Sequence, residues 1–121
     1  MEDLVPFDHE KLDVYKLAIE FVATAADLVE PFPRGRGYLV DQIQRAALSI
    51  VLNTAEGAGR ISPRDKASFY VRARGSTTES AAVIDVCLCL KLIDEAQARQ
   101  PKDMLDRIAQ MLTKLIKAHQ T

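Results

Sequence analysis

Six polar side chains recur along one segment of the chain at steps of three or four residues. They are Gln42, Arg45, Ser49, Asn53, Glu56 and Arg60, and a shorter run of the same kind follows at Arg72, Ser76 and Glu79. On a helix, this spacing places the side chains of each run on one face. A solvated face tolerates almost any charged residue, so the mixture of Ser, Asn and Gln with single charges favours a hydrogen-bonded network between helices or subunits. We therefore predict a structural polar network made of Gln42, Arg45, Ser49, Asn53, Glu56, Ser76 and Glu79.

Two acids of these runs, Glu56 and Glu79, are the candidates for general acid or base chemistry. That chemistry would require them to form a buried pair with a shared proton. A salt bridge from either acid to Arg45, Arg60 or Arg72 is the interpretation we favour, because an unpaired buried carboxylate is costly. The two acids are therefore expected to stabilise the structure.

The residues that metal or nucleophilic catalysis needs are scarce. His9 and His119 are the only histidines, and both lie near the ends of the sequence. A di-metal site in a helical bundle needs Glu-x-x-His pairs, a zinc site needs clustered Cys and His ligands, and a Ser or Cys nucleophile needs a His within reach. Residues 57–60, Gly-Ala-Gly-Arg, lack the lysine and the preceding strand of a phosphate loop, so they are interpreted as a helix stop. We expect no enzyme activity, no metal and no cofactor.

Basic residues gather in one part of a chain whose net charge is −1. Residues 34–74 carry eight basic and three acidic side chains, whereas residues 1–33 carry eight acidic and two basic ones. A basic patch of this kind attracts phosphates or an acidic protein surface. The nucleic-acid candidates are Arg34, Arg36, Arg60, Arg64, Lys66, Arg72 and Arg74. Alternatively, the acidic and basic segments face each other across helices or subunits. The near-neutral charge and the lack of aromatic residues near these basic residues for base stacking count against nucleic acid.

Four segments that repeat apolar residues with a helical period must position these side chains. The expected helices span residues 10–30, 38–58, 63–92 and 95–118. Pro31 and Pro33 end the first helix, and Ser62 followed by Pro63 begins the third. Since the connections are short, consecutive helices must be antiparallel neighbours. The sequence predicts one all-α domain over residues 1–121, an antiparallel up-down-up-down four-helix bundle.

The apolar positions also predict which faces are buried. The expected stripe of the first helix is Tyr15, Ala18, Ile19, Val22, Ala25, Ala26 and Val29. Residues 81–93 are apolar nearly all round, so we expect them to be the most buried part of the molecule. Gly75 interrupts the third helix, where we expect a neighbouring backbone to approach closely. The apolar faces of the first and third helices are too wide for a four-helix core alone, which predicts a homo-oligomer.

The cellular compartment is predicted from the cysteines and from the absence of targeting signals. No stretch reaches the ~20 apolar residues of a membrane span, and the acidic N-terminal segment lacks the pattern of a signal peptide. Cys87 and Cys89 lie about 200° apart on a helix, so they neither pair with each other nor share an ion. Interpreted as free core thiols, they indicate a reducing compartment. We expect a cytoplasmic protein without a membrane partner.

The segment 42–60 also carries the motif of a known family. Its pattern is Gln-Ile-x-Arg-Ala, then Ser-Ile, then Asn-x-Ala-Glu-Gly-x-Gly-Arg, and the next helix carries Phe69, Ala73, Gly75, Ser76 and Glu79. This arrangement resembles the four-helix-bundle proteins encoded by intervening sequences in bacterial large-subunit rRNA genes. It is more distantly similar to the accessory variability proteins of diversity-generating retroelements. The similarity extends over residues 8–118.

The resemblance implies an up-down bundle that assembles into a ring-shaped homopentamer. In the retroelement branch it implies a ring that binds nucleic acid and partners a reverse transcriptase. Two hypotheses follow for this chain. The favoured one is an oligomer that binds RNA or DNA through the basic segment, and the alternative is a scaffold or adaptor ring that docks another protein.

Overall fold

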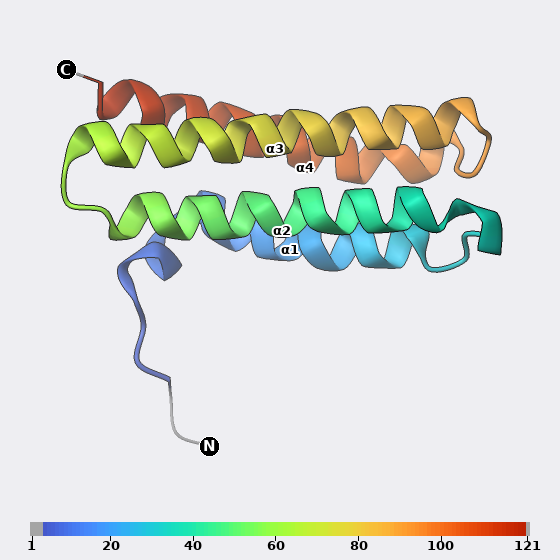
Figure 1. The fold of residues 1–121 in the computed structure, drawn as a ribbon, viewed down its shortest axis with the longest axis horizontal. Coiled ribbons are helices and arrows are strands. Elements are labelled where there is room, and N and C mark those ends of the chain that lie inside the picture. Colours follow the sequence, from blue (N-terminus) through green and yellow to red (C-terminus); the bar gives the residue numbers. More distant parts are fainter. Residues whose placement is uncertain (1–3, 121) are drawn as a thin grey trace.

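Four long α-helices form the molecule (Figure 1). The computed structural model describes residues 4–120, and its helices are α1 (Asp13–Val29), α2 (Gly37–Gly59), α3 (Pro63–Cys89) and α4 (Glu95–Ala118). Two short 3-10 turns, η1 (Asp8–Lys11) and η2 (Arg34–Arg36), precede α1 and α2. No strand occurs in the part of the chain that the structure describes. The predicted all-α class is confirmed.

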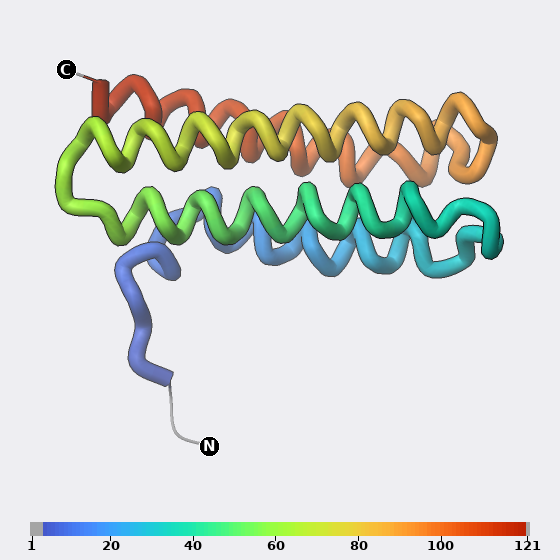
Figure 2. Tube along the Cα trace, in the orientation of Figure 1, coloured from blue at the N-terminus to red at the C-terminus, as the bar shows by residue number. Residues whose placement is uncertain are grey.

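Consecutive helices run in opposite directions, as Figure 2 shows along the tube. Each helix packs against the next one, and α1 also packs against α4, which closes the bundle. The α2–α3 connection lies at the same end as the start of α1 and the end of α4, and the α1–α2 and α3–α4 connections lie at the other end. The arrangement is an antiparallel four-helix bundle.

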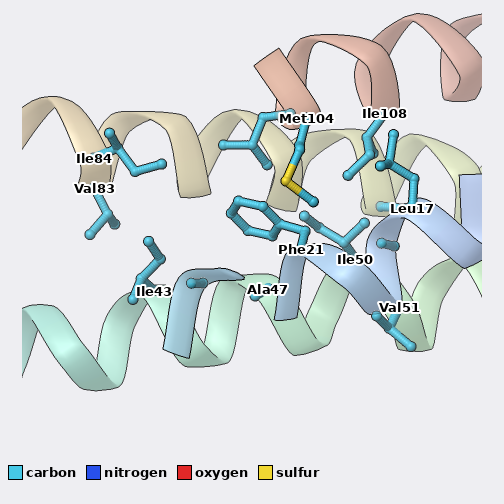
Figure 3. Packing of buried hydrophobic residues seen from close by; sticks show 14 of the residues in the cluster. Leu17, Phe21, Ile43, Ala47, Ile50, Val51, Val83, Ile84, Met104 and Ile108 are labelled. Carbon is cyan, nitrogen blue, oxygen red and sulfur yellow. The ribbon is translucent and has the colours of Figure 1, made fainter. Parts of the chain in front are cut away.

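The core runs along the centre of the bundle, and every helix contributes to it. Its largest fully buried side chains include Phe21 of α1, Ile50 of α2, Ile84 of α3 and Ile108 of α4. Figure 3 shows Phe21 beside Ile50 and Met104, in the middle of this cluster. Burying a side chain of this size contributes about 1.5–3 kcal/mol relative to leaving it exposed.

The buried face of α1 differs from the expected stripe. The structure buries Val14, Leu17, Ala18, Phe21, Ala25 and Val29, while Ile19 is 45% exposed. The two stripes share Ala18, Ala25 and Val29, so periodicity allows either of them. The observed stripe includes Leu17 and Phe21, and turning these larger side chains inward removes more apolar area from water.

Two helix ends depart from the expected positions. α1 begins at Asp13, three residues later than expected, because residues 8–11 form η1 and Leu12 is extended. α3 ends at Cys89 and not at residue 92, because Lys91 adopts the left-handed conformation with φ 59°. Leu92 N then donates to Cys87 O and Lys91 N donates to Leu88 O, both at 3.0 Å. This is the Schellman closure of a helix, here without the usual glycine.

The expectation that residues 81–93 are the most buried part of the molecule is wrong, since six of these thirteen residues are exposed. Val83, Ile84 and Cys87 are buried, but Val86 and Leu90 are 43% and 38% exposed. Because α3 lies at the edge of a four-helix bundle, only the face toward the core is covered by other helices.

The glycines of α2 and α3 have different surroundings from those we expected. Gly57 lies inside α2, where a Cβ atom would stand 2.7 Å from Cε1 of Tyr70. The helix stops at Arg60, whose backbone is extended, and Lys66 Nζ caps it by donating to the carbonyls of Gly57 and Ala58 at 3.4 and 2.8 Å. A Cβ at Gly75 would have no atom within 4 Å other than those of its own stretch of α3. The close approach expected there is therefore absent among the residues that the structure describes.

Candidate nucleic-acid interface

Polar side chains lie along the contact between α2 and α3 and join the two helices. Gln42 Nε2 donates to Glu79 Oε2 at 2.8 Å, and the hydroxyls of Ser49 and Ser76 lie 2.7 Å apart. Asn53 Nδ2 donates to the backbone oxygen and to Oγ of Ser49, both at 3.0 Å. We call Gln42, Ser49, Asn53, Ser76 and Glu79 the polar seam. Its serines and asparagine are half-buried, so these hydrogen bonds fix the register of α2 against α3.

Arg45 and Glu56, the other two members of the predicted network, lie outside the seam. Glu56 forms a salt bridge with Arg60 on the same helix, at 3.1 Å. Arg45 is exposed, and within residues 4–120 its side chain makes neither a hydrogen bond nor a salt bridge. The expected salt bridge of Glu79 is replaced by the hydrogen bond from Gln42.

Glu56 and Glu79 do not form a buried acid pair. Both carboxylates are exposed. Glu79 reaches α2 at Gln42, which lies 14 residues before Glu56, or about 21 Å along the helix. A shared proton needs two carboxylates within hydrogen-bond reach. This arrangement therefore offers no acid–base pair.

The seven basic candidates do not form one patch. Arg34 and Arg36 lie in η2, whereas Arg60, Arg64 and Lys66 lie around the α2–α3 connection. The 23 residues of α2 separate the two groups, which is about 34 Å at 1.5 Å per residue. Figure 1 places the two connections at opposite ends of the bundle. A run of basic residues in sequence is therefore divided by the length of a straight helix.

Two further candidates are engaged within the fold. Lys66 is half-buried and caps α2, as described above. Arg74 Nε donates to Thr113 Oγ1 of α4 at 2.8 Å, so Arg74 faces the α3–α4 side of the bundle. Neither side chain points toward the polar seam.

Arg60 and Arg72 share an aromatic partner that the sequence analysis missed. The guanidinium carbon of each arginine lies 4.6 Å from the centre of the Phe69 ring. A cation at this distance from a ring is attracted by its quadrupole and is held in place. We call Arg60, Phe69 and Arg72 the Arg–Phe cluster. The spacing of Phe69 three residues before Arg72 is the signal that predicts contact on one helix face.

The Arg–Phe cluster remains open to solvent. Arg60 and Arg72 are both exposed, and Arg64 in the first turn of α3 is exposed at the same end of the bundle. Arg60 is paired with Glu56, but in the described part of the chain Arg72 and Arg64 form no salt bridge. Guanidinium groups offer several N–H donors in a fixed plane that matches phosphate geometry. Chemically, this end of the molecule is suited to binding anions.

Exposed apolar side chains flank the seam on both helices. Leu48 and Leu52 of α2 are 50% and 54% exposed, and Val71 and Val86 of α3 are 52% and 43% exposed. We call these four residues the outer face. Val71 and Val86 lie fifteen residues apart on α3, which is about 22 Å, so the outer face is a set of separate exposed apolar side chains along the two helices. Such side chains are available to a protein partner that covers α2 and α3.

The described part of the chain has no cluster of metal-ligating side chains, and one of its two thiols is buried. Among residues 4–120, no group of three or more His, Cys, Asp or Glu side chains is placed to hold a metal ion. Burial raises the pKa of the Cys87 thiol, which keeps the thiol protonated and weakens it as a nucleophile. Cys89 is a free thiol on the surface of α3 and not the core residue we expected, because Cys87 takes the inward position. Within the same residues, no helix has the length and apolar character to cross a bilayer.

Comparisons with known proteins agree with this geometry. A solved structure of a protein of unknown function from the S23 ribosomal protein family of Bacteroides thetaiotaomicron superposes with a TM-score of 0.80 at 18% identity. The match covers 92% of this chain and 99% of that one, and at this identity it shows the fold alone. No curated protein matches the sequence. The family model of the 23S rRNA-intervening sequence proteins matches residues 10–114, which include all of the polar seam and the Arg–Phe cluster, and the chain belongs to that family.

Proposed function

We propose that this protein is a non-catalytic, self-assembling helical bundle that binds the phosphates of nucleic acid through Arg60, Arg64 and Arg72. The observation that carries the proposal is the Arg–Phe cluster, in which two guanidinium groups are held 4.6 Å from one ring. A positioned guanidinium loses less side-chain entropy on binding a phosphate than a free one does. Binding of this kind is tolerant of sequence, because phosphates carry no base information.

The proposal includes self-assembly, because one subunit offers only a few arginines for binding phosphates. The outer face leaves four large apolar side chains exposed on α2 and α3, and the family resemblance implies a ring-shaped homopentamer. Five copies of the 13.4 kDa chain would have a mass of about 67 kDa and would repeat the cluster around one face. Repetition raises the overall affinity well above that of a single site.

The proposal is tested with two variants that remove the same charge from opposite ends of the bundle. Arg60→Ala with Arg72→Ala removes the cluster, and Arg34→Ala with Arg36→Ala is the matched control. Labelled RNA and duplex DNA are titrated at several salt concentrations. Each lost phosphate contact lowers the slope of log Kobs against log salt by about 0.9 on duplex DNA. We therefore expect a change of about two for each subunit whose cluster contacts the duplex, and a small change for the control.

Two results would refute this function. Failure of the unaltered protein to bind either ligand at low salt excludes a phosphate site. If both variants weaken nucleic-acid binding equally, binding depends on the net charge and not on the Arg–Phe cluster. The mass of every variant is measured by light scattering in the same buffer, so that a loss of assembly is not mistaken for a loss of contact.

The alternative function is a scaffold or adaptor ring that docks another protein. It is favoured by the placement of four of the seven basic candidates, because Lys66 and Arg74 are engaged within the fold and Arg34 and Arg36 lie at the far end. A stable oligomer that binds no nucleic acid at low salt would support it. In either case, we place the protein in the reducing cytoplasm, where free thiols such as Cys87 and Cys89 persist.

A further inference from the structure

The segment before η1 is apolar and largely exposed. Leu4, Val5 and Phe7 are 92%, 81% and 67% exposed. Figures 1 and 2 show this segment leaving the bundle and running away from all four helices. We call residues 4–7 the arm. Three large apolar side chains within four exposed residues are unfavourable in water and favour an apolar partner.

An apolar groove lies between the start of α1 and the end of α4. Its volume is about 350 Å³, and its lining is almost entirely apolar, from Leu12, Val14, Met111, Leu115 and Ala118, with Asp13 and Lys114 also on its wall. We call it the α1–α4 groove. Met111 and Leu115 are only partly buried, so the groove exposes apolar surface that a further apolar side chain would cover.

The arm of a given chain is directed away from the groove of that chain. Phe7 N donates to Glu10 Oε2 at 2.7 Å, and the rings of Phe7, His9 and Tyr15 contact each other in series, with centroids 5.9 and 4.6 Å apart. η1 packs against α1 and α2 and not against α4. The arm therefore leaves the bundle on the α1–α2 side, as in Figure 1. Its four residues span at most about 14 Å, and reversing its direction would break these contacts.

We infer that the arm of one copy docks in the α1–α4 groove of a neighbouring copy. The charges of the two elements are complementary. Asp8 and Glu10 follow the arm, and Glu2 and Asp3 precede it in the sequence. Lys114 lines the groove and Lys117 follows it on α4, so the lysines at this end outnumber Asp13 on the groove wall. In the described part of the chain neither lysine forms a salt bridge. Apolar side chains supply the affinity, and the charges fix the orientation of the arm.

This inference rests on the proposed self-assembly but uses a different surface. The outer face belongs to α2 and α3, whereas the groove belongs to α1 and α4. Arm exchange would therefore add a second contact between subunits that already associate through the outer face. A second copy is the occupant that the structure favours, because the same chain supplies both the exposed apolar segment and the groove of complementary charge.

The test uses disulfide formation between two differently labelled chains. One chain carries Val5→Cys and the other carries Ala118→Cys, both in a Cys89→Ser background that leaves only the buried Cys87. The chains are mixed, assembled and oxidised mildly. We expect a mixed disulfide to form about tenfold faster than with a control chain carrying Asp103→Cys farther along α4, because docking raises the effective concentration of the two thiols.

Each outcome decides the inference. Equal rates for Ala118→Cys and Asp103→Cys would overturn it. The inference would also be overturned if a chain carrying both Val5→Cys and Ala118→Cys formed only an internal disulfide and no disulfide to a second copy. Light scattering separates this failure from failure of the proposed function, since an oligomer that persists without the cross-link refutes only the arm exchange. The nucleic-acid titration depends on Arg60 and Arg72 and is unaffected by the test.

Discussion

The contact between Gly57 and Tyr70 makes a common substitution behave in an unusual way. Replacing glycine by alanine inside a helix normally stabilises it by about 1 kcal/mol. At Gly57 the added Cβ would stand 2.7 and 2.9 Å from two ring carbons of Tyr70 and 3.2 Å from the carbonyl oxygen of Lys66. Carbon atoms prefer a separation of about 3.5–4.0 Å, so the ring must move by close to an ångström.

The size of the effect follows from the burial of Tyr70, which is 2% exposed. Forcing extra volume into a packed core costs about 1–3 kcal/mol. After the helix gain of about 1 kcal/mol is subtracted, Gly57→Ala is expected to lower the free energy of unfolding by up to about 2 kcal/mol. Gly75→Ala is the control, because no atom lies within 4 Å of its Cβ. It should raise the stability by about 1 kcal/mol.

The assay is urea unfolding followed by far-UV circular dichroism. All variants are compared at one protein concentration, since assembly makes stability depend on concentration. A third variant combines Gly57→Ala with Tyr70→Leu and is compared with Tyr70→Leu alone. Without the ring, the alanine should no longer destabilise. If Gly57→Ala proves as stable as Gly75→Ala, or destabilises equally without the ring, the packing argument is refuted.

Two further predictions concern the end of α3 and the buried titratable groups. Lys91→Gly should stabilise the fold by about 1 kcal/mol, because Lys91 is held at φ 59°, which costs a non-glycine residue about that much; an unchanged urea midpoint would contradict it. Burial raises the pKa of Tyr70 and of Cys87, so the folded protein keeps protons that the unfolded chain releases. Stability is therefore intact below about pH 8.5, the ordinary range of a thiol, and falls as the pH rises toward the folded values. Urea midpoints measured against pH should show this fall, and Tyr70→Phe with Cys87→Ala should flatten it.

Much of the fold follows from local signals that are readable in the sequence. The expected range of α4, residues 95–118, coincides with the helix in the structure. Asp94 accepts from Gln97 N at 2.8 Å, and Gln97 Oε1 accepts from Asp94 N at 2.9 Å, which closes a capping box at its start. Ser62 accepts from Asp65 N at 3.1 Å at the start of α3. Such signals are predictable because capping and periodicity involve residues within one turn of each other.

The candidate site was predicted less completely, because it depends on which residues meet across helices. The regular spacing of Gln42, Ser49 and Asn53 indicates a polar strip, but the spacing does not say that Gln42 pairs with Glu79 rather than an arginine. Phe69 was absent from the expected basic patch, since its contact with Arg60 crosses from the end of α2 to α3. Partners across two helices depend on register, and register is decided by packing.

The sequence by itself determined that four amphipathic helices form, where most of them begin and end, and that consecutive helices must be antiparallel. Periodicity, proline, caps and short connections are local properties, and they act before any helix meets another. Only the tertiary structure decided which stripe of α1 faces the core, why α2 keeps Gly57, and how the basic residues are distributed. A straight helix of 23 residues separates Arg36 from Arg60, and packing against α2 brings Phe69 and Arg72 to Arg60. In a bundle, helix length and register decide which side chains lie close together. Neither can be read from the composition or from a run of charged residues.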